Sequence, residues 1–557
     1  MDLRHPYLTG QLIAYIGNKR ALLPFLHGVF SRLADGSPRV SFLDPFAGSG
    51  SVSRLARLMG FAVGANDWEP YSWVINSCHL LVGETELGSL FRSRGGIDAV
   101  LGELNLLSAP PEEERYIARH FAPRRTETAD WRTERLFYTT ENALFIDAVR
   151  ERIEEMYPGI PAGETAFKEK MALLAPLVYA AATRTNTSGV FKAFHRGFGG
   201  HGGDALKRIT GPIRMERPLL ADSPSPAAVS RENAADFLRA RSADICYLDP
   251  PYSVHQYGSN YFMLNTIALW DRPPVSGERG PDGRLLRKAG IREDWTRTRS
   301  AFCYAGTALP ALREVVSSAD CRWLAVSYSN EGLVGLEELC DMLAETGDLT
   351  VHSTGYAKYP GGKQSLARRT RNVELLLVVD RRTAPSAGAR QMTARRLLDL
   401  RIARLMGSSF DPARIRETFR TDGEGRLAGL PAGADLGLPM PWFHRFAPGT
   451  NPPRLADPED AKCFLALLSS CEIADAREEI RVLREMLRGE NDPRERRRIF
   501  REILRFLNRL AHAKYRGIFL EELEALRILA AADPRGERFR AGLEKVAERA
   551  SRRMHRG

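Results

Sequence analysis

The sequence contains no apolar run that approaches the roughly 18 residues needed to cross a membrane. Its N-terminal segment lacks the apolar core of a signal peptide, so we expect a cytoplasmic protein. It has only seven cysteines, an odd number, without CxxC spacing or a Cys/His cluster. We therefore expect no disulfide framework and no metal site.

Acidic residues are fewer than basic ones, 69 against 80, which leaves a formal net charge of +11. Such a field attracts polyanions, but charge alone leaves the presence of a nucleic-acid partner open. A chain of 557 residues, 43% hydrophobic and 27% charged, has the composition of a globular protein and is long enough for more than one core.

The region near residue 50 reads as a strand, a glycine loop and a helix. Residues 40–46 form an apolar run, Gly48 and Gly50 open the turn, and a helical pattern follows up to Gly60. A second strand is expected over 61–67, which completes a βαβ unit. Further strands are expected at 244–249, 322–328 and 372–380. The pattern predicts an α/β fold with a doubly wound, Rossmann-like parallel sheet.

Two other regions depart from this pattern. Residues 85–235 mix helical segments with a Gly-rich basic run and read as an insertion, whereas residues 383–557 are mostly helical. One helix is expected over 492–516, with Asp492 as N-cap, Pro493 at its first position and an end before Gly517. We expect a catalytic domain made of 1–84 and 236–382, the inserted region and a helical C-terminal domain.

The strongest local motif is Asp249-Pro250-Pro251-Tyr252, directly after an apolar strand. Ligands of open α/β sheets bind at the carboxyl ends of the strands, where this motif lies. The carboxylate and a backbone carbonyl can accept the two hydrogens of an aromatic amine, and the tyrosine ring can stack on its base. The motif predicts a site for a planar amine, although Asp-Pro-Pro also begins ordinary loops.

A second motif, DPFAGSG, runs from Asp44 through Phe46, Gly48 and Gly50 and is followed by Asp67 at the next strand end. Small residues let the backbone approach a ligand, and the second acid can accept hydrogen bonds from ribose hydroxyls. This predicts an adenosyl-bearing cofactor. The GxGxxG spacing of dinucleotide sites is missing, and no Gly-Lys-Ser/Thr follows, which excludes a P-loop.

Two weaker signals involve single side chains. Asp236 and Phe237 could hold the cofactor's adenine, or Phe237 could simply be a buried residue of an amphipathic helix. The segment that begins at Tyr15 could present Lys19 to a cofactor carboxylate, or Lys19 could be a solvated surface charge.

Together these pieces resemble the Dam-like (D12 class) adenine-N6 DNA methyltransferases. YIGNKRALLP, DPFAGSG, NDWEP, NAADF and DPPY stand in that family's order, and the resemblance covers roughly residues 8–382 apart from the insertion. It implies S-adenosylmethionine as cofactor, double-stranded DNA as substrate and partner, and Asp249, Pro250, Pro251 and Tyr252 as the catalytic motif. It also implies a place in restriction-modification or epigenetic marking, near the nucleoid, with a separate cognate restriction endonuclease as a candidate partner.

The same resemblance places target recognition in the insertion. Arg184, Asn186 and residues 189–191 resemble the family's R-x-N-x-x-G-x-F signature, and Arg and Asn can read guanine and adenine. Lys192 follows where relatives tend to have Asn, so DNA contacts there depart from the family pattern. Methylation of cytosine N4, methylation of RNA and a DNA-binding regulator with a degenerate core remain the alternatives.

Overall fold

A computed structural model describes residues 2–37, 39–161, 163–200, 203–357, 371–424, 426–431, 434–441, 444–447, 449–532 and 536–554. Contacts divide the chain into two compact units. The first comprises Met1–Thr354 and Glu374–Arg390, and the second contains residues 391–557. Among the described residues, none of the helices has both the length and the apolar character that a membrane crossing requires.

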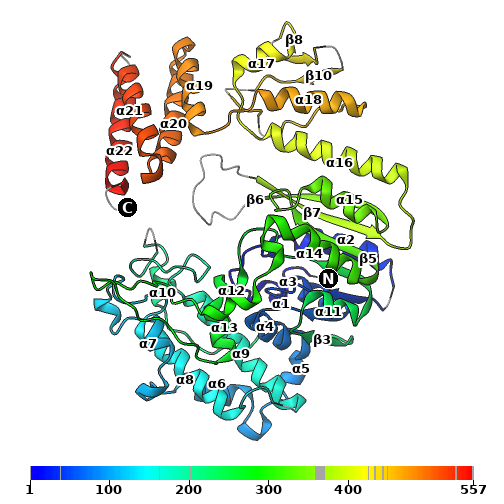
Figure 1. Ribbon diagram of the computed structural model, residues 1–557, viewed down its shortest axis with the longest axis vertical. Helices are drawn as coiled ribbons and strands as arrows, with labels where there is room; N and C mark the ends of the chain where they lie inside the picture. Colours follow the sequence, from blue (N-terminus) through cyan, green and yellow to red (C-terminus); the bar gives the residue numbers. More distant parts are fainter. Residues whose placement is uncertain are drawn as a thin grey trace. The chain divides into compact units, whose positions relative to one another are not determined.

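The first unit is built on a seven-stranded sheet with helices on its faces (Figure 1). Its strands are β1 (Ser41–Asp44), β2 (Ala62–Asn66), β3 (Ala227–Ser230), β4 (Ser242–Leu248), β5 (Asp320–Ser329), β6 (Asp348–Ala357) and β7 (Arg371–Asp380). They lie in the order β3-β2-β1-β4-β5-β7-β6. The first five run parallel, and β7 is antiparallel to β5. The carboxyl ends of β1, β2 and β4 therefore meet at one edge.

This mixed sheet is consistent with an α/β methyltransferase fold, and the five strands expected from the sequence are confirmed within a few residues at their ends. The expectation of a parallel sheet is wrong for β7, which runs antiparallel to β5. Two strands of this sheet were not predicted. β3 lies inside the stretch 85–235 and pairs with β2, so the sheet resumes at Ala227. Its four small residues lack a β-branched or aromatic run. β6, at the edge of the sheet, alternates polar and apolar residues instead of forming a continuous apolar run.

Helices around the sheet begin and end close to the strand ends. They are α1 (Pro6–Thr9), α2 (Leu23–Ala34), α3 (Ser51–Leu58), α4 (Pro70–Leu81), α11 (Ala234–Arg239), α14 (Ala305–Ser318) and α15 (Leu336–Ala344). Gly50 caps α3 with φ +79°, and a Cβ there would lie 2.6 Å from the Asn76 Oδ1 atom. Glycine is required at this turn because both its conformation and its space exclude a side chain.

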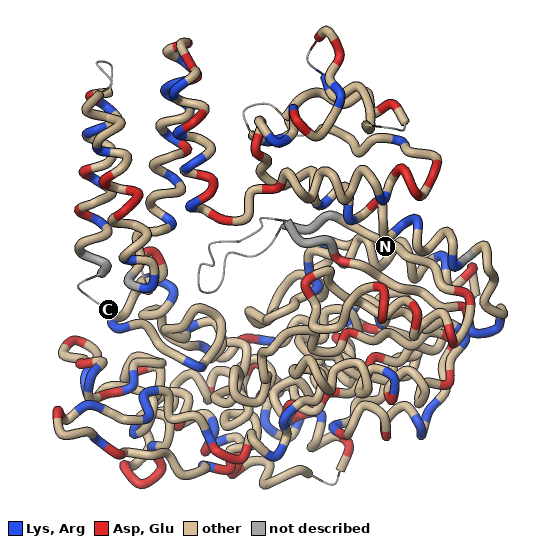
Figure 2. The backbone as a smooth tube through the Cα atoms, turned by 45° about the horizontal axis from the view of Figure 1, so that its top comes forward, with Lys and Arg blue, Asp and Glu red and all other residues tan. Residues whose placement is uncertain are grey.

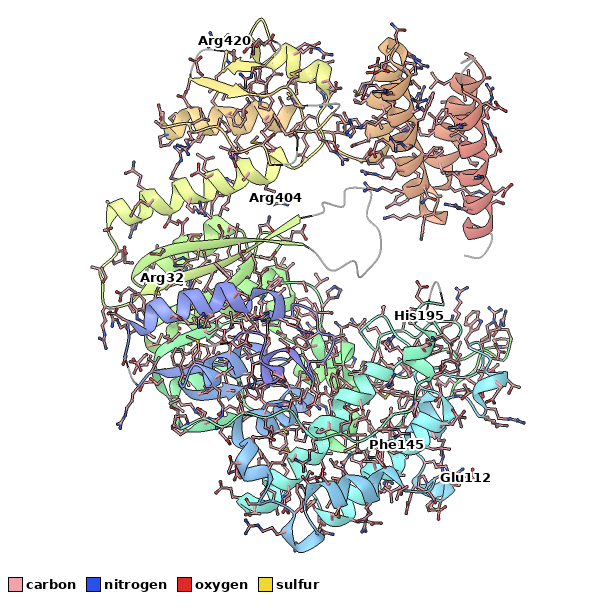
Figure 3. All side chains as sticks on the ribbon, turned by 180° about the vertical axis from the view of Figure 1, so that it is seen from behind. Arg32, Glu112, Phe145, His195, Arg404 and Arg420 are labelled. Atoms are coloured by element: carbon pink, nitrogen blue, oxygen red, sulfur yellow. The ribbon has the colours of Figure 1, made fainter. Side chains whose placement is uncertain are left out.

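The stretch between β2 and β3 folds into further helices, among which Glu112 and Phe145 are labelled in Figure 3. They are α5 (Glu84–Leu87), α6 (Ile97–Asn105), α7 (Ile117–Phe121), α8 (Thr140–Met156), α9 (Glu164–Arg184) and α10 (Leu206–Thr210). One hydrophobic core joins this stretch to α4, α12 (Tyr257–Asn260) and α13 (Phe262–Leu269). The long helix α9 packs against α4 and α13, so this stretch shares its core with elements that follow β2 and β4.

The second unit is mostly helical, with Lys/Arg and Asp/Glu positions interspersed along its helices (Figure 2). Its elements are α16 (Ala387–Met406), α17 (Pro412–Thr418), α18 (Pro458–Ser470), α19 (Ala476–Gly489), α20 (Pro493–Leu510), α21 (Arg516–Ala531), α22 (Glu537–Met554) and the short strands β8 (Arg420–Thr421), β9 (Leu427–Gly429) and β10 (Asp435–Leu438). Two hydrophobic clusters hold it together, one around α16–α18 and one among α19–α22.

The helix expected over 492–516 is correct at its start and wrong at its end. Asp492 caps α20 by accepting from the Arg494 N–H, but the helix stops at Leu510. Gly517 instead lies in the first turn of α21. The break turns the chain so that Phe519, Leu523 and Leu526 return to the core that α20 covers, and this tertiary packing outweighs the local helical pattern.

Candidate active site

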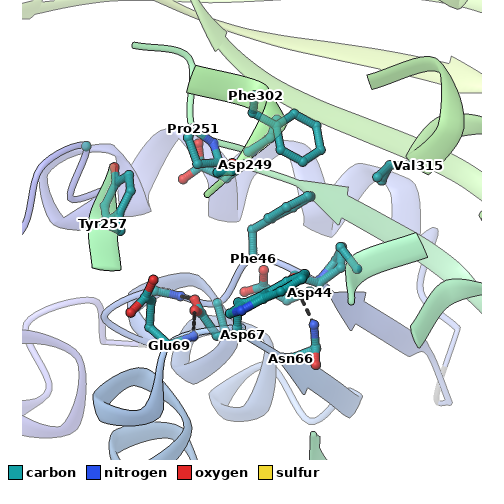
Figure 4. A pocket seen from close by; sticks show the side chains of 18 of the residues that line it. Asp44, Phe46, Asn66, Asp67, Glu69, Asp249, Pro251, Tyr257, Phe302 and Val315 are labelled. Atoms are coloured by element: carbon teal, nitrogen blue, oxygen red, sulfur yellow. Dashed lines mark hydrogen bonds between the residues drawn. The ribbon is translucent and has the colours of Figure 1, made fainter. Parts of the chain in front are cut away.

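A cavity of about 250 Å³ lies at the carboxyl ends of β1, β2 and β4. Figure 4 shows Asp44, Asp67 and Asp249, which follow these strand ends, around this one cavity. These positions are far apart in the sequence, but they meet because parallel strands present their carboxyl ends at the same edge. The sheet therefore brings together the glycine loop, the second acid and the DPPY motif, as the sequence predicts.

The glycine loop forms the floor of the cavity and approaches its neighbours closely. Gly48 has φ +51°, and a Cβ there would lie 2.9 Å from the ring of Tyr15. Tyr15 in turn stacks on Tyr261 at 5.2 Å. The loop is fixed from the other side because the Asp67 carboxylate accepts from the Gly48 N–H at 2.7 Å.

Asp44 and Asp67 have carboxyl groups in an environment that disfavours their charged forms. Burial raises the pKa of Asp44 to about 7 and also raises the pKa of Asp67. One oxygen of Asp44 accepts from the Ser53 hydroxyl at 2.6 Å, whereas its Oδ1 is buried without a hydrogen-bond partner. A buried acceptor without a donor is costly, and it is satisfied if a ligand supplies one.

Asp67 accepts one backbone N–H on each oxygen, from Gly48 and from Glu69 at 2.9 Å. Each carboxylate oxygen can accept a second hydrogen bond, so Asp67 keeps capacity for two hydroxyl donors. The neighbouring Trp68 lines the cavity with an exposed ring and adds a face for a planar group.

Asp249 belongs to a three-residue charge cluster. The buried Lys19 ammonium lies 3.0 Å from Asp249 and 2.5 Å from Glu374 on β7. Burial raises the pKa of Asp249 to about 6 although Lys19 opposes this shift. Burial alone would lower the pKa of Lys19, but Asp249, with Tyr252 and Glu374, raises it well above its usual value. Lys19 thus stays charged and fixes the Asp249 carboxylate.

Aromatic rings surround the charged cluster. The Lys19 Nζ atom lies 5.1 Å from the centroid of the Tyr252 ring, which also packs edge-on against Tyr328. Across the cavity, Phe46 and Phe302 meet edge-to-face at 5.3 Å. Pro250 and Pro251 line the same space. Rings and rigid backbone on several sides suit flat heterocycles better than flexible chains.

The charge of the lining identifies which ligands fit. The cavity wall contains two cations, Lys19 and Arg299, and six carboxyl groups. The carboxyl groups are those of Asp44, Asp67, Glu69, Glu232, Asp249 and Glu314. This excess of negative charge disfavours phosphate-bearing nucleotides and favours a ligand that carries positive charge or many hydrogen-bond donors.

Asp236 and Phe237 do not reach the cavity, contrary to the sequence expectation. Residues 233–235 at the start of α11 line it. One residue position on α11 makes the difference, because Asp236 points to solvent and pairs with Arg239 at 2.6 Å. The Phe237 ring is buried in the core beneath the Arg241 guanidinium. The alternative reading of Phe237 as a core residue of an amphipathic helix is therefore the one that the structure supports.

The three residues proposed to contact DNA have different environments. Asn186 is fully buried and donates to the carbonyls of Leu136 and His195, so it shapes the loop. Arg184 is half-buried and donates to the Arg208 carbonyl. Lys192 alone is exposed. It follows Phe191, whose N–H donates to the Asn260 carbonyl at 2.7 Å in the segment after the DPPY motif. Burial lowers the pKa of His255 in that segment, and the Lys192 charge adds to this effect.

Sequence reasoning missed four acids at or beside the cavity: Glu69, Glu232, Glu314 and Glu374. Glu374 lies inside the apolar strand NVELLLVVD, whose other acid, Asp380, is at the end of the strand, and that interruption was the available signal. Glu69 is buried beside Asp67 and accepts from the Asn265 amide at 2.5 Å. Burial raises the pKa of Glu69 to about 7. Neither role can be read from local spacing, because their partners are nearly two hundred or more residues away.

Comparison with known proteins agrees with this geometry. Residues 15–284 match the model of the D12 class N6 adenine-specific DNA methyltransferases. The chain is 31% identical over 353 residues to the type II methyltransferase M.NlaIII of Neisseria lactamica, an alignment that covers 63% of this chain and 93% of that protein.

Two other relatives align over a similar stretch of this chain. Modification methylase LlaI of Lactococcus lactis subsp. lactis is 29% identical, with 65% of this chain and 54% of that protein covered. The type II methyltransferase M.CviAII of Paramecium bursaria Chlorella virus 1 is 27% identical, with 61% and 90% covered. On the strength of the near-complete coverage of M.NlaIII and of the family match, the chain belongs to the D12 class N6 adenine-specific DNA methyltransferases.

Proposed function

We propose that this DNA methyltransferase moves a methyl group from S-adenosylmethionine to N6 of an adenine that leaves the duplex and enters the cavity. The observation that carries the proposal is the meeting of Asp249 with Asp44 and Asp67 in one cavity. Asp249 suits an exocyclic amine, whereas Asp44 and Asp67 suit an adenosyl group with a cationic chain. Transfer requires both ligands side by side.

The residues present fit S-adenosylmethionine. Asp67 has free acceptor capacity for the ribose hydroxyls, and the unpartnered Asp44 Oδ1 can accept from the amino group of the methionine part. Phe46 and Trp68 offer faces for the adenine ring. When bound, this cofactor supplies an electrophilic methyl group on a cationic sulfur, and the acidic lining favours that charge.

At the reacting end, Asp249 and the Pro250 carbonyl accept the two N6 hydrogens and turn the nitrogen lone pair toward the methyl group. Tyr252 holds the base by stacking. Because the pKa of Asp249 is about 6, the side chain is a carboxylate at neutral pH and can take up the proton that N6 must lose. Lys19 orients this carboxylate through the 3.0 Å contact. Rate enhancement comes mainly from positioning and from charge placed in advance.

We assign the remaining regions by exclusion and charge. Residues 85–235, with the exposed Lys192, would recognise the target sequence in double-stranded DNA. Residues 383–557 would be an accessory region, since they lie outside the stretch matched by the family model. A separate cognate endonuclease is the partner expected for a restriction-modification enzyme.

The test is a methyl-transfer assay with labelled S-adenosylmethionine and mixed-sequence genomic DNA, followed by mass spectrometry of the nucleosides. We expect N6-methyladenine from the wild type. Asp249→Ala should lower the rate by about a thousandfold or more, while duplex binding persists. Asp320→Ala is the matched control, because Asp320 is exposed at the opposite end of the neighbouring strand β5 and should keep wild-type activity.

Each alternative has its own outcome. N4-methylcytosine as the product would reassign the base, and preferential labelling of RNA would reassign the substrate. Duplex binding by a wild type that transfers no methyl group would indicate a regulator and would refute the catalytic proposal.

A further inference from the structure

Three cationic side chains gather around one tryptophan outside the cavity. The Trp131 ring centroid lies 4.6 Å from Arg196 Cζ, 5.0 Å from Arg132 Cζ and 5.3 Å from Lys288 Nζ. All three charged side chains are exposed, and they come from segments that are distant in the sequence. Arg132 also pairs with Asp130, whose carboxylate lies 3.3 Å from its guanidinium.

Three like charges at one ring repel each other, and the attraction between each cation and the ring face offsets this only in part. An anion bound beside the ring would offset this repulsion. Guanidinium groups present planar forks of donors that match phosphate oxygens, and the ammonium adds a point charge. The cluster thus has the chemistry of a phosphate site with three donors.

Lys288 is held in this cluster by a strap of residues 273–290, which Figure 1 draws in green near α7. The buried Arg135 donates to the carbonyls of Lys288, Arg287 and Ser276. The Leu285 N–H donates to the Arg132 carbonyl at 3.1 Å, which ties the strap to the segment that carries Trp131. Because these four hydrogen bonds fix the backbone of the strap, the position of Lys288 is defined.

The cluster is connected to the neighbourhood of the cavity by residues 191–196. The Phe191 N–H donates at 2.7 Å to the carbonyl of Asn260 on α12, the helix that begins with the cavity-lining Tyr257. Lys192 follows directly and precedes Arg196 by four residues, which span at most about 14 Å when extended. Duplex DNA advances by about 3.4 Å per base pair, so Lys192 and Arg196 lie within about four base-pair steps of each other.

We infer that Arg132, Arg196 and Lys288 around Trp131 form a clamp for the phosphate backbone of duplex DNA. The clamp uses a strap that follows the catalytic motif in the sequence and lies outside the inserted region. Phosphate contacts position the duplex and carry no sequence information, so this surface contributes affinity and register but not specificity. The inference rests on the proposed function only for the identity of the substrate.

The test is the salt dependence of binding to a fluorescent duplex, measured by anisotropy with the full chain. Lys288→Ala and Arg132→Ala should each reduce the slope of log Kd against log salt by about 1, because each removes one phosphate contact. The double substitution should reduce it by about 2. The weakening should be equal for a substrate duplex and for an unrelated one.

Arg32→Ala is the control, because Arg32 is an exposed arginine on α2 that Figure 3 shows far from His195. It should leave the slope unchanged. Circular dichroism of each variant checks that the exposed substitutions leave the fold intact.

Unchanged slopes for Lys288→Ala and Arg132→Ala in a wild type that methylates DNA would overturn the clamp and leave the enzyme proposal standing. Reduced slopes in a protein without methyl transfer would support the clamp and refute the proposed activity. Tighter binding of structured RNA, weakened by the same substitutions, would assign the surface to RNA and also overturn the inference.

Discussion

Two regions of this protein bury their side chains in opposite ways. The site at the strand ends buries charged groups, among them Asp44, Lys19 and Glu374, which lie at or below 5% exposure. The core among α19–α22 buries apolar side chains such as Ile503 and Leu507, while the arginines Arg497 and Arg501 of the same helix stay in solvent.

The difference separates what folding requires from what chemistry requires. Burial of an apolar side chain stabilises the fold, whereas burial of a charge costs free energy unless a partner compensates it. The helical core can therefore be explained by stability alone. The cavity cannot, because an unpartnered Asp44 oxygen and a raised pKa at Asp249 lower stability in the free protein and are useful only when a ligand arrives.

The largest expected effect comes from removing the one buried cation of the charge cluster. Lys19→Met leaves the carboxylates of Asp249 and Glu374 without their counter-ion, so the free energy of unfolding should fall by about 3–5 kcal/mol. In whatever fraction folds, the pKa of Asp249 should rise, and the acidic limb of kcat/KM should move to higher pH. Urea unfolding and a pH–rate profile measure the two changes.

Lys545→Met is the control, since this lysine is exposed on α22 and the variant should unfold at the wild-type urea concentration. Equal stabilities for Lys19→Met and Lys545→Met, with superimposable pH profiles, would show that the cluster is not coupled in the way the distances indicate.

A smaller effect is expected from a substitution in the helical core, which should lower the free energy of unfolding without changing the chemistry of the site. Ile503 is fully buried on α20, so Ile503→Ala leaves a cavity and should cost about 3 kcal/mol. The pH dependence of methyl transfer should stay that of the wild type, because no titrating group of the site changes. The neighbouring exposed substitution Arg501→Ala should change the free energy of unfolding by less than about 0.5 kcal/mol.

If Ile503→Ala shifted the pH–rate profile, the second region would contribute to the chemistry of the first and the contrast would fail. If Arg501→Ala cost as much as Ile503→Ala, the arginine face would be structural instead of solvated.

The same contrast explains how far the sequence could be read. Continuous apolar strands, the glycine loop and the DPPY motif are local patterns, so β1, β2, β4, β5 and β7 and the three acids at the strand ends were predictable. The short edge strand β3 and the alternating strand β6 carry weaker local signals and were missed. The end of α20 was misplaced because tertiary packing, not propensity, decides where that helix turns.

Within the site, the errors fall where orientation or distance matters. Asp236 and Ala235 are neighbours in the sequence, yet the helix turns one toward solvent and the other toward the cavity. Lys19, Asp249 and Glu374 are separated by 230 and 125 residues, so no spacing rule connects them. Their contact follows from the sheet order, which brings β7 within reach of β4 and the N-terminal segment.

The smallest of these effects on stability is expected at Asp44, and its sign is the most informative. Because the pKa of Asp44 is about 7 in the folded protein and 3.8 as a free side chain, the folded state binds the proton more tightly. Stability contributed by this proton is complete below about pH 4 and is lost as pH rises toward 7. The difference between these two pKa values corresponds to a loss of at most about 4 kcal/mol in the free energy of unfolding at high pH.

Asp44→Asn removes this loss, since an amide does not ionise. The amide accepts more weakly than the carboxylate from the Ser53 hydroxyl and the Phe46 N–H, which offsets about half of the gain in stability. The variant should therefore be more stable than the wild type by about 2 kcal/mol at pH 8 and no more stable at pH 4. Urea unfolding at both pH values measures this. The same variant should bind S-adenosylmethionine more weakly in calorimetry, because the acceptor proposed for its amino group loses its charge. Unchanged stability at pH 8 would mean that the Asp44 carboxylate carries no burial cost; unchanged cofactor affinity would remove Asp44 from the proposed cofactor site.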